Sequence, residues 1–290
     1  MEEPEPSVEQ NIVDLPYSDR QLIVVTDDSI ADATRKEERK AIKVDKKGVD
    51  WQRIVEAVFS DILPIPFSRV LTEVSKEAIR AWGRARQSGI NILPIGKSAI
   101  NQISFAPGHP REGVLYIGHP ALPSIYYTVA EFHRATFEHK FSEAINLLMN
   151  LGATTIKVEY VRGWSKDFSS KISVPLGVAA ESINAGAKSK SSSSTKLLYE
   201  ATLAGTESPS VPDGLVWYPY ENTWQAIANG RINFGLQDFS LSISYEDDFG
   251  VNAGLKAAVL KAGLEIGGNF EDHESTVWHL QGKFKVKSIA

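Results

Sequence analysis

The chain has no cysteine among its 290 residues. Disulfides, thiolate metal sites and a cysteine nucleophile are therefore excluded, and nothing indicates an oxidising compartment. Long apolar runs are missing too, because no stretch of about 18 apolar residues occurs that could form a transmembrane helix. The N-terminal MEEPEPSVEQ has neither the basic region nor the apolar core of a secretory signal. These absences predict a cytoplasmic protein, for which any peripheral contact with a membrane, or insertion into it, would be conditional on activation.

Catalytic motifs are also lacking. LPIGKSAI contains the Gly-Lys-Ser of a phosphate-binding loop, but Asn91 stands where that motif needs a glycine. GWSKD has Asp167 in place of the second glycine of a nucleophile elbow. His273 and His279 are six residues apart, whereas a zinc-protease helix needs two histidines four apart. We therefore expect a protein without a cofactor that is not an enzyme.

Three further histidines are the candidates for a metal site, although no metal is predicted from them. His109 and His119 each lie in a Gly-His-Pro turn, and His133 lies on a predicted helix that could bring it close to them. The alternative for each is a structural histidine whose ring is hydrogen-bonded within the protein.

Hydrophobic residues make up 42% of the chain and charged residues 23%, which is typical of a soluble globular protein with a large core. The net charge of −5 argues against nucleic acid as a partner. Charge is nevertheless uneven: residues 1–20 are predicted to form an acidic flexible tail, while RKEERKAIKVDKK at 35–47 is basic. Both segments are typical of solvated surface, and the alternative is an electrostatic clasp or a partner-binding tail.

The N-terminal part, 21–127, is predicted to be an α/β region. QLIVVTDD at 21–28 is a short apolar run typical of a strand, and helical spacing marks 49–62 and about 68–86. The proline-rich and glycine-rich stretch 90–127 reads as short extended pieces between turns.

The C-terminal part, 128–290, is predicted to be an α+β domain. A helix should run from about Thr128 to a glycine at its end, and TTIKVEYV after it alternates as a half-buried strand does. FSLSISY and TVWHLQGKFKVK alternate in the same way, the second with a basic outer face. The predicted fold class is therefore α+β, with a mostly antiparallel or mixed sheet and packed helices behind a helical N-terminal part.

An octapeptide occurs twice with little change in this C-terminal half. KDFSSKIS begins at Lys166 and QDFSLSIS at Gln237, and each is followed by an Asn-Ala-Gly-x-Lys segment and a closing strand. We interpret 165–205 and 236–286 as duplicated units, each made of a strand, an excursion and a second strand in one sheet.

The excursions are rich in small apolar residues, and each can be read in two ways. One reading is a helix packed on the sheet, with a Ser-rich loop in the first excursion. The other is a pair of alternating strands long enough to cross a bilayer as a hairpin. Lys261 and Glu265 share the parity of the apolar residues before them, so the hairpin needs a register break near Lys261. The residues predicted to rearrange or to contact a membrane are Ile172, Val174, Leu176, Val178, Val251, Leu255, Val259 and Ile266.

In its organisation, roughly 165–290 is similar to perforin-like and gasdermin-like proteins, in which two such segments leave one sheet and become membrane hairpins. The similarity includes no sequence motif of either family and implies no residue roles.

A cluster of aromatic residues in VWYPYENTWQAIANGR is a further candidate site. Trp217, Tyr218, Tyr220 and Trp224 surround a proline turn and the start of a short helix. Such a cluster can bind a ligand or lie at a membrane interface. More often it covers a hydrophobic core.

We therefore expect a non-enzymatic cytoplasmic effector that oligomerises and acts on membranes as pore formers do. Its expected partners are copies of itself, membrane lipid on activation and a regulatory protein. The alternative is a soluble adaptor module that binds a ligand or a protein, and the third possibility is an enzyme of unrecognised type.

Overall fold

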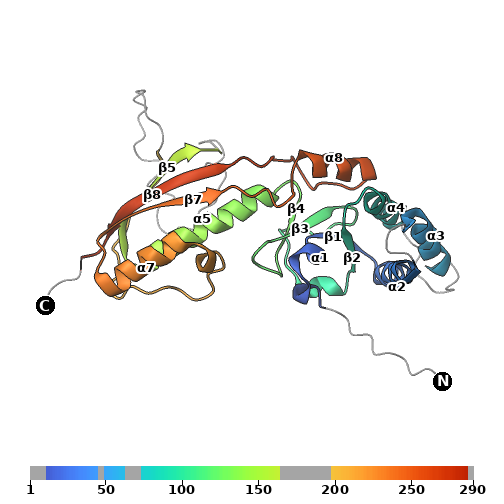
Figure 1. The fold of residues 1–290 in the computed structure, drawn as a ribbon, viewed down its shortest axis with the longest axis horizontal. Coiled ribbons are helices and arrows are strands. Elements are labelled where there is room, and N and C mark those ends of the chain that lie inside the picture. Colours follow the sequence, from blue (N-terminus) through green and yellow to red (C-terminus); the bar gives the residue numbers. More distant parts are fainter. Residues whose placement is uncertain (1–10, 45–48, 63–72, 164–196, 287–290) are drawn as a thin grey trace, which may run out of the picture. The chain divides into compact units, whose positions relative to one another are not determined.

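The computed structural model describes residues 11–44, 49–62, 73–163 and 197–286 (Figure 1). Contacts divide the chain into two compact units. The first holds Met1–His133 and Gly250–Asp272, and the second holds Arg134–Phe249 and His273–Ala290. The chain therefore passes from one unit to the other three times.

The first unit is built on a four-stranded mixed sheet with the order β2-β1-β3-β4. β1 and β2 run parallel, while β1 with β3 and β3 with β4 are antiparallel. The strands are β1 (Leu22–Thr26), β2 (Ile92–Gly96), β3 (Leu115–Gly118) and β4 (Tyr126–Thr128).

Helices connect the two parallel strands, as a parallel pair requires. They are α2 (Asp28–Val44), α3 (Trp51–Ile62) and α4 (Glu73–Gln87). α4 packs on the sheet through Trp82, whose side chain is fully buried and whose Nε1 donates to the Ile92 carbonyl at 3.0 Å. The other helices described in this unit are η1 (Ile12–Asp14), α1 (Tyr17–Arg20), η2 (Ala99–Gln102) and α8 (Ala253–Ala262).

The second unit is built on an antiparallel sheet with the order β6-β5-β8-β7. The helices α5 (Phe132–Asn150, in this unit from Arg134) and α7 (Asn222–Phe234), with η3 (Tyr218–Tyr220), supply the other layer (Figure 1). The core between the layers includes Phe137, Phe141 and Trp224 from the helices and Trp278 from the sheet. The strands are β5 (Ala153–Arg162), β6 (Leu197–Thr202), β7 (Asp238–Tyr245) and β8 (Thr276–Phe284).

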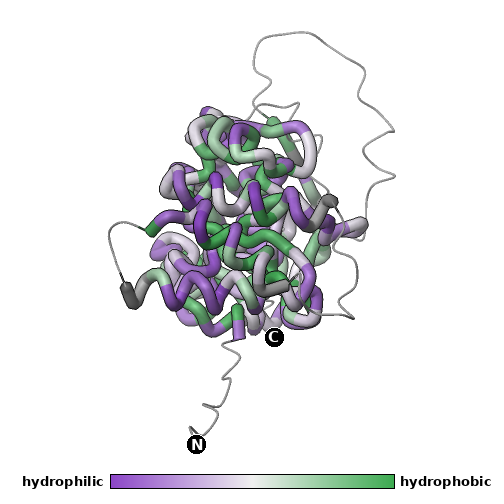
Figure 2. Tube along the Cα trace, turned by 90° about the vertical axis from the view of Figure 1, so that its right-hand side faces the viewer, coloured by the Kyte–Doolittle hydropathy of each residue, from purple (hydrophilic) through white to green (hydrophobic). Residues whose placement is uncertain are grey.

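Strict alternation in β7 explains why one face of this sheet is buried. Phe239, Leu241, Ile243 and Tyr245 are buried, whereas Ser240 and Ser242 between them are exposed. Hydrophobic and hydrophilic stretches follow one another along much of the chain (Figure 2), as expected for elements with one buried face.

The predicted α+β fold class is confirmed: one sheet is mixed, the other is antiparallel, and helices pack on both. The internal duplication is not confirmed, because KDFSSKIS and the excursion after it lie outside the described residues.

Two stretches of the chain differ from the predicted domain bounds. Residues 11–20, expected as part of a flexible tail, are folded, with Ile12 and Arg20 buried. Residues 250–272 cluster with the first unit, although the sequence grouped them with the second.

The sequence of the excursion after β7 fits either a helix or a strand, and in the structure this excursion forms the helix α8. The Asn252 side chain accepts hydrogen bonds from the Gly254 and Leu255 amides, which caps the start of α8. Gly263 ends the helix with φ of 91°, a conformation that glycine adopts without strain. These two caps select the helix over the equally apolar strand.

Candidate functional site

The three candidate histidines are engaged in hydrogen bonds within the first unit. His109 Nδ1 lies 2.7 Å from the Tyr116 hydroxyl, and His119 Nδ1 accepts from the Ala121 and Leu122 amides. The buried His133 bonds the Val251 carbonyl through Nε2. Across the described ranges, no three histidine, aspartate or glutamate side chains gather as metal ligands would.

The candidate aromatic residues do not converge on one surface. Trp224 is fully buried in the core of the second unit, while Tyr220 is 79% exposed. Trp217 is half-buried, and its Nε1 donates to His139 Nδ1 at 3.0 Å. Burial lowers the pKa of His139, which keeps the ring neutral and able to accept this bond.

A carboxylate anchors the segment that carries these aromatics. Both oxygens of Glu143 on α5 accept backbone amides, those of Val216, Trp217 and Tyr218, each at 2.8 Å. Lys140, one turn earlier, pairs with Glu221 at 2.5 Å. The aromatic cluster is therefore tied to α5, as expected of a segment that covers a core.

Of the residues predicted to contact a membrane, only those after β7 are described. Val251 and Val259 are fully buried, and Leu255 and Ile266 are half-buried. The hydrogen bonds that hold this segment in the first unit include those from the Arg84 side chain to the Ala262 carbonyl, from Leu115 N to the Glu265 carbonyl, and from Ala130 N to the Ile266 carbonyl. Ile172, Val174, Leu176 and Val178 lie outside the described residues.

Both excursions begin and end at the same end of the second sheet, which we call the excursion end. The first connects β5 to β6 and the second connects β7 to β8, and the two hairpins are joined because β5 pairs with β8. The pairs at the excursion end are Glu159 with Leu197, Arg162 with Val277, and Tyr245 with Thr276.

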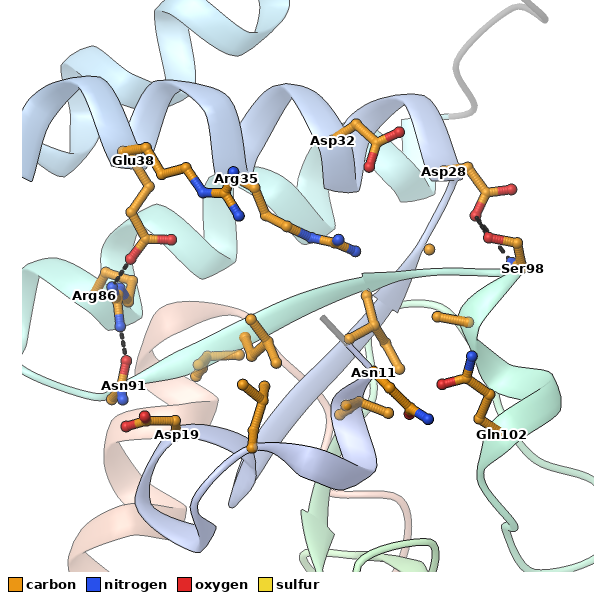
Figure 3. Close-up of a pocket in the computed structure, with 18 residues that line it drawn as sticks. Asn11, Asp19, Asp28, Asp32, Arg35, Glu38, Arg86, Asn91, Ser98 and Gln102 are labelled. Atoms are coloured by element: carbon orange, nitrogen blue, oxygen red, sulfur yellow. Dashed lines mark hydrogen bonds and ion pairs between the residues drawn. The ribbon is translucent and has the colours of Figure 1, made fainter. Parts of the chain in front are cut away.

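A separate cavity of about 480 Å³ lies in the first unit, between α2 and β2 (Figure 3). Its polar lining comes mainly from one face of α2, where Asp28, Asp32 and Arg35 follow one another at helical spacing. Its apolar lining comes from η1, the loop after it and β2, through Ile12, Leu15, Leu93 and Ile95.

Internal contacts close both ends of this cavity (Figure 3). At one end Arg86 bonds both Glu38 and Asn91. Burial raises the pKa of Glu38 in spite of the neighbouring guanidinium, and it lowers the pKa of Arg86. At the other end Asp28 Oδ1 accepts from the Ser98 amide at 2.9 Å and from its hydroxyl at 2.8 Å.

Gly96 makes the second closure possible. A Cβ atom at this position would lie 2.1 Å from Asp28 Oδ1, so any other residue would displace the carboxylate. This cavity was not predicted, because the charges of 35–47 are typical of solvated surface. The spacing of Asp28, Asp32 and Arg35 was the available signal.

Comparison of the chain with protein-family models, curated proteins and solved structures found no match.

Proposed function

We propose that this protein is a non-enzymatic effector that oligomerises and acts on membranes, with the segment between β7 and β8 converting from α8 to a membrane hairpin. The observation that carries the proposal is the pairing register of those two strands. The pairing runs from Asp238 with Lys283 to Tyr245 with Thr276 without a register shift, so the two residue numbers of every pair add up to the same value.

Continuing this register through the excursion pairs apolar residues with apolar residues. Leu255 falls opposite Ile266 and Ala257 opposite Leu264. The apolar residues continue the face of β7 and β8 that is buried in the second unit. The full set of pairs on this face is Val251 with Phe270, Ala253 with Gly268, Leu255 with Ile266, Ala257 with Leu264, and Val259 with Ala262.

The opposite face of the same hairpin would be polar or small. Lys256 falls opposite Glu265, so two charges that would be costly in lipid become a cross-strand ion pair on the face away from it. Asn252 falls opposite Asn269. The strands, residues 251–259 and 262–270, have nine residues each, and a strand needs about 9 to 11 to cross a bilayer.

A membrane hairpin needs a register break near Lys261, and the turn at the tip of this hairpin provides it. Leu260 and Lys261 fall between the two strands, which moves Lys261 to the turn and Glu265 to the polar face. Neither turn residue is the glycine or asparagine that two-residue turns favour. Lys261 at the tip would lie beyond the far side of the bilayer core, where its charge is solvated.

Sheet topology supports an assembly of several chains. β6 and β7 are the outermost strands of the second sheet and run in opposite directions. β7 of one chain could therefore pair with β6 of the next and keep the sheet antiparallel. Both excursions would then extend from the same end of every chain.

In the part of the chain that is described, no helix is both long and apolar enough to span a bilayer.

Dye release from vesicles that contain anionic lipid tests the proposal. The full chain and a chain without residues 1–10 are compared, because a longer truncation would remove folded residues, beginning with η1. At least one form should release the dye and form a lipid-bound oligomer. If neither form does so, the proposal fails.

Two neighbouring substitutions on α8 test the hairpin itself. Ala257→Arg would put a charge on the lipid face, at a cost of about 2 to 4 kcal/mol per chain, whereas Ala258→Arg would put it on the polar face. We expect Ala257→Arg to abolish dye release and Ala258→Arg to retain it. In α8, Ala257 is exposed and Ala258 half-buried, so damage to the folded helix would give the opposite order and would contradict the hairpin.

A further inference from the structure

The cavity between α2 and β2 has the features of a ligand site that is independent of membrane action. It lies beside β1 and β2, a parallel pair connected through helices, and one of its walls continues past the carboxyl end of β2 into Ser98 and η2. In open α/β sheets, ligands bind outside the carboxyl ends of such strands. A volume of about 480 Å³ is within the usual range for small-molecule sites.

Away from the contacts at its two ends, the cavity is lined by four charged side chains: Asp19, Asp32 and Arg39 are exposed, and Arg35 is half-buried. The closures at the two ends use Glu38 with Arg86 and Asp28 with Ser98. Arg35 extends from α2 toward β2 between them (Figure 3). The Nε atom of Arg35 is buried, and this atom has no hydrogen-bond partner within the described residues. A buried donor without a partner is costly, and an anionic ligand would remove that cost.

The walls near Arg35 define the rest of the ligand. Ile12 and Ile95 are buried, and Leu15 and Leu93 are partly buried beside them, so the cavity offers an apolar surface below the guanidinium. A ligand that fits both features has one anionic group and an apolar body.

A peptide that pairs with β2 as an added strand is a less suitable ligand for this cavity. The Ile92 amide is bonded to the Ile90 carbonyl, and the Ile92 carbonyl accepts from Trp82. Pro94, in the middle of β2, has no amide hydrogen to donate. Few backbone groups of β2 therefore remain for a further strand.

The geometry points to a binding site for a small organic anion, a carboxylate or phosphate ester with an apolar body, whose charge is held by Arg35. This site goes beyond the proposed membrane function and does not depend on it.

Two fluorescent probes with the same apolar body test the site. Anilinonaphthalene sulfonate carries an anionic group, and N-phenylnaphthylamine is its neutral counterpart. We expect the sulfonate to bind one site per chain and Arg35→Gln to weaken it by about ten- to a hundredfold, the range for a lost charged hydrogen bond. The affinity of the neutral probe should change less than twofold.

Two control variants make the result decisive. Ala99→Phe fills the cavity but keeps Arg35, and it should weaken both probes. Arg53→Gln removes an exposed arginine of α3 and should change neither. Circular dichroism verifies that each variant is folded. The inference is overturned if the sulfonate has no saturable site, if Arg35→Gln changes its affinity by less than twofold, or if both probes weaken equally in Arg35→Gln.

Discussion

The phenol of Tyr126 is fully buried in the first unit, and its hydroxyl donates to the Arg20 carbonyl at 3.0 Å. Burial raises the pKa of Tyr126 to about 12, although the nearby Arg20 guanidinium acts in the opposite direction. Ionisation therefore requires either a much higher pH or unfolding.

A loss of stability at alkaline pH follows from this pKa. Because the folded pKa is above the unfolded value of 10.0, the contribution of Tyr126 is fully present below pH 10 and is lost as the pH rises toward 12. We expect the free energy of unfolding to decline over this window by roughly 2 kcal/mol more in the wild type than in Tyr126→Phe. Urea unfolding at several pH values measures the difference, and parallel declines would contradict it.

Individual residues of the cavity illustrate what the sequence could not reveal. Asn11, Arg35 and Asn91 line one space, but they come from segments that only the parallel pairing of β1 and β2 brings together. Pairing between strands that are about seventy residues apart leaves no local pattern in the sequence. His109 and His119 were the opposite case, because their hydrogen-bond partners, such as Tyr116 and Leu122, lie within a few residues of them in the sequence.

Among the elements, strands with strict alternation were predicted best. β7 alternates along its length and β8 does so except at Gly282, and the burial of their other residues follows that pattern. α2 was missed because its sequence is strongly charged, and its fully buried face is marked, among the residues whose burial is described, by Ile30, Ala31 and Thr34. α8 was ambiguous because small apolar residues satisfy both periods, and the cap residues Asn252 and Gly263 were the deciding signal.

The segment before α7 owes its position to α5, and Glu143 provides the test. Glu143→Ala would leave three backbone amides without their acceptor, and we expect the free energy of unfolding to fall by about 2 to 3 kcal/mol. Urea unfolding followed by tryptophan fluorescence measures this change.

A neighbouring glutamate of the same helix serves as the control. Glu138 is partly exposed and pairs with Arg134 at 3.4 Å, so Glu138→Ala should cost less than about 1 kcal/mol. Equal losses in the two variants would show that Glu143 does not anchor the segment.

At the scale of the whole molecule, the proposed function requires residues 251–270 to leave the first unit. Val114 and Glu265 are bridge partners there, and adjacent strands are close enough for a disulfide between such partners. Because the chain has no cysteine, Val114→Cys with Glu265→Cys can form only one intramolecular disulfide, which mass spectrometry can verify.

We expect this disulfide to block dye release and a reducing agent to restore it. Each single cysteine variant is a control and should release dye with or without the reductant. Release from the oxidised double variant at the wild-type rate would mean that the segment does not need to detach.

The position of β8 in the second sheet has a consequence for synthesis of the chain. β8 follows the other described strands of this sheet in the sequence, yet it lies between β5 and β7 and pairs with both. Until residues 276–284 have left the ribosome, the β5–β6 hairpin and β7 have no strand to join them. The second unit therefore completes its sheet only after β8 has been made, and a nascent chain that stops before β8 exposes the edges of β5 and β7 to chaperones or to other copies.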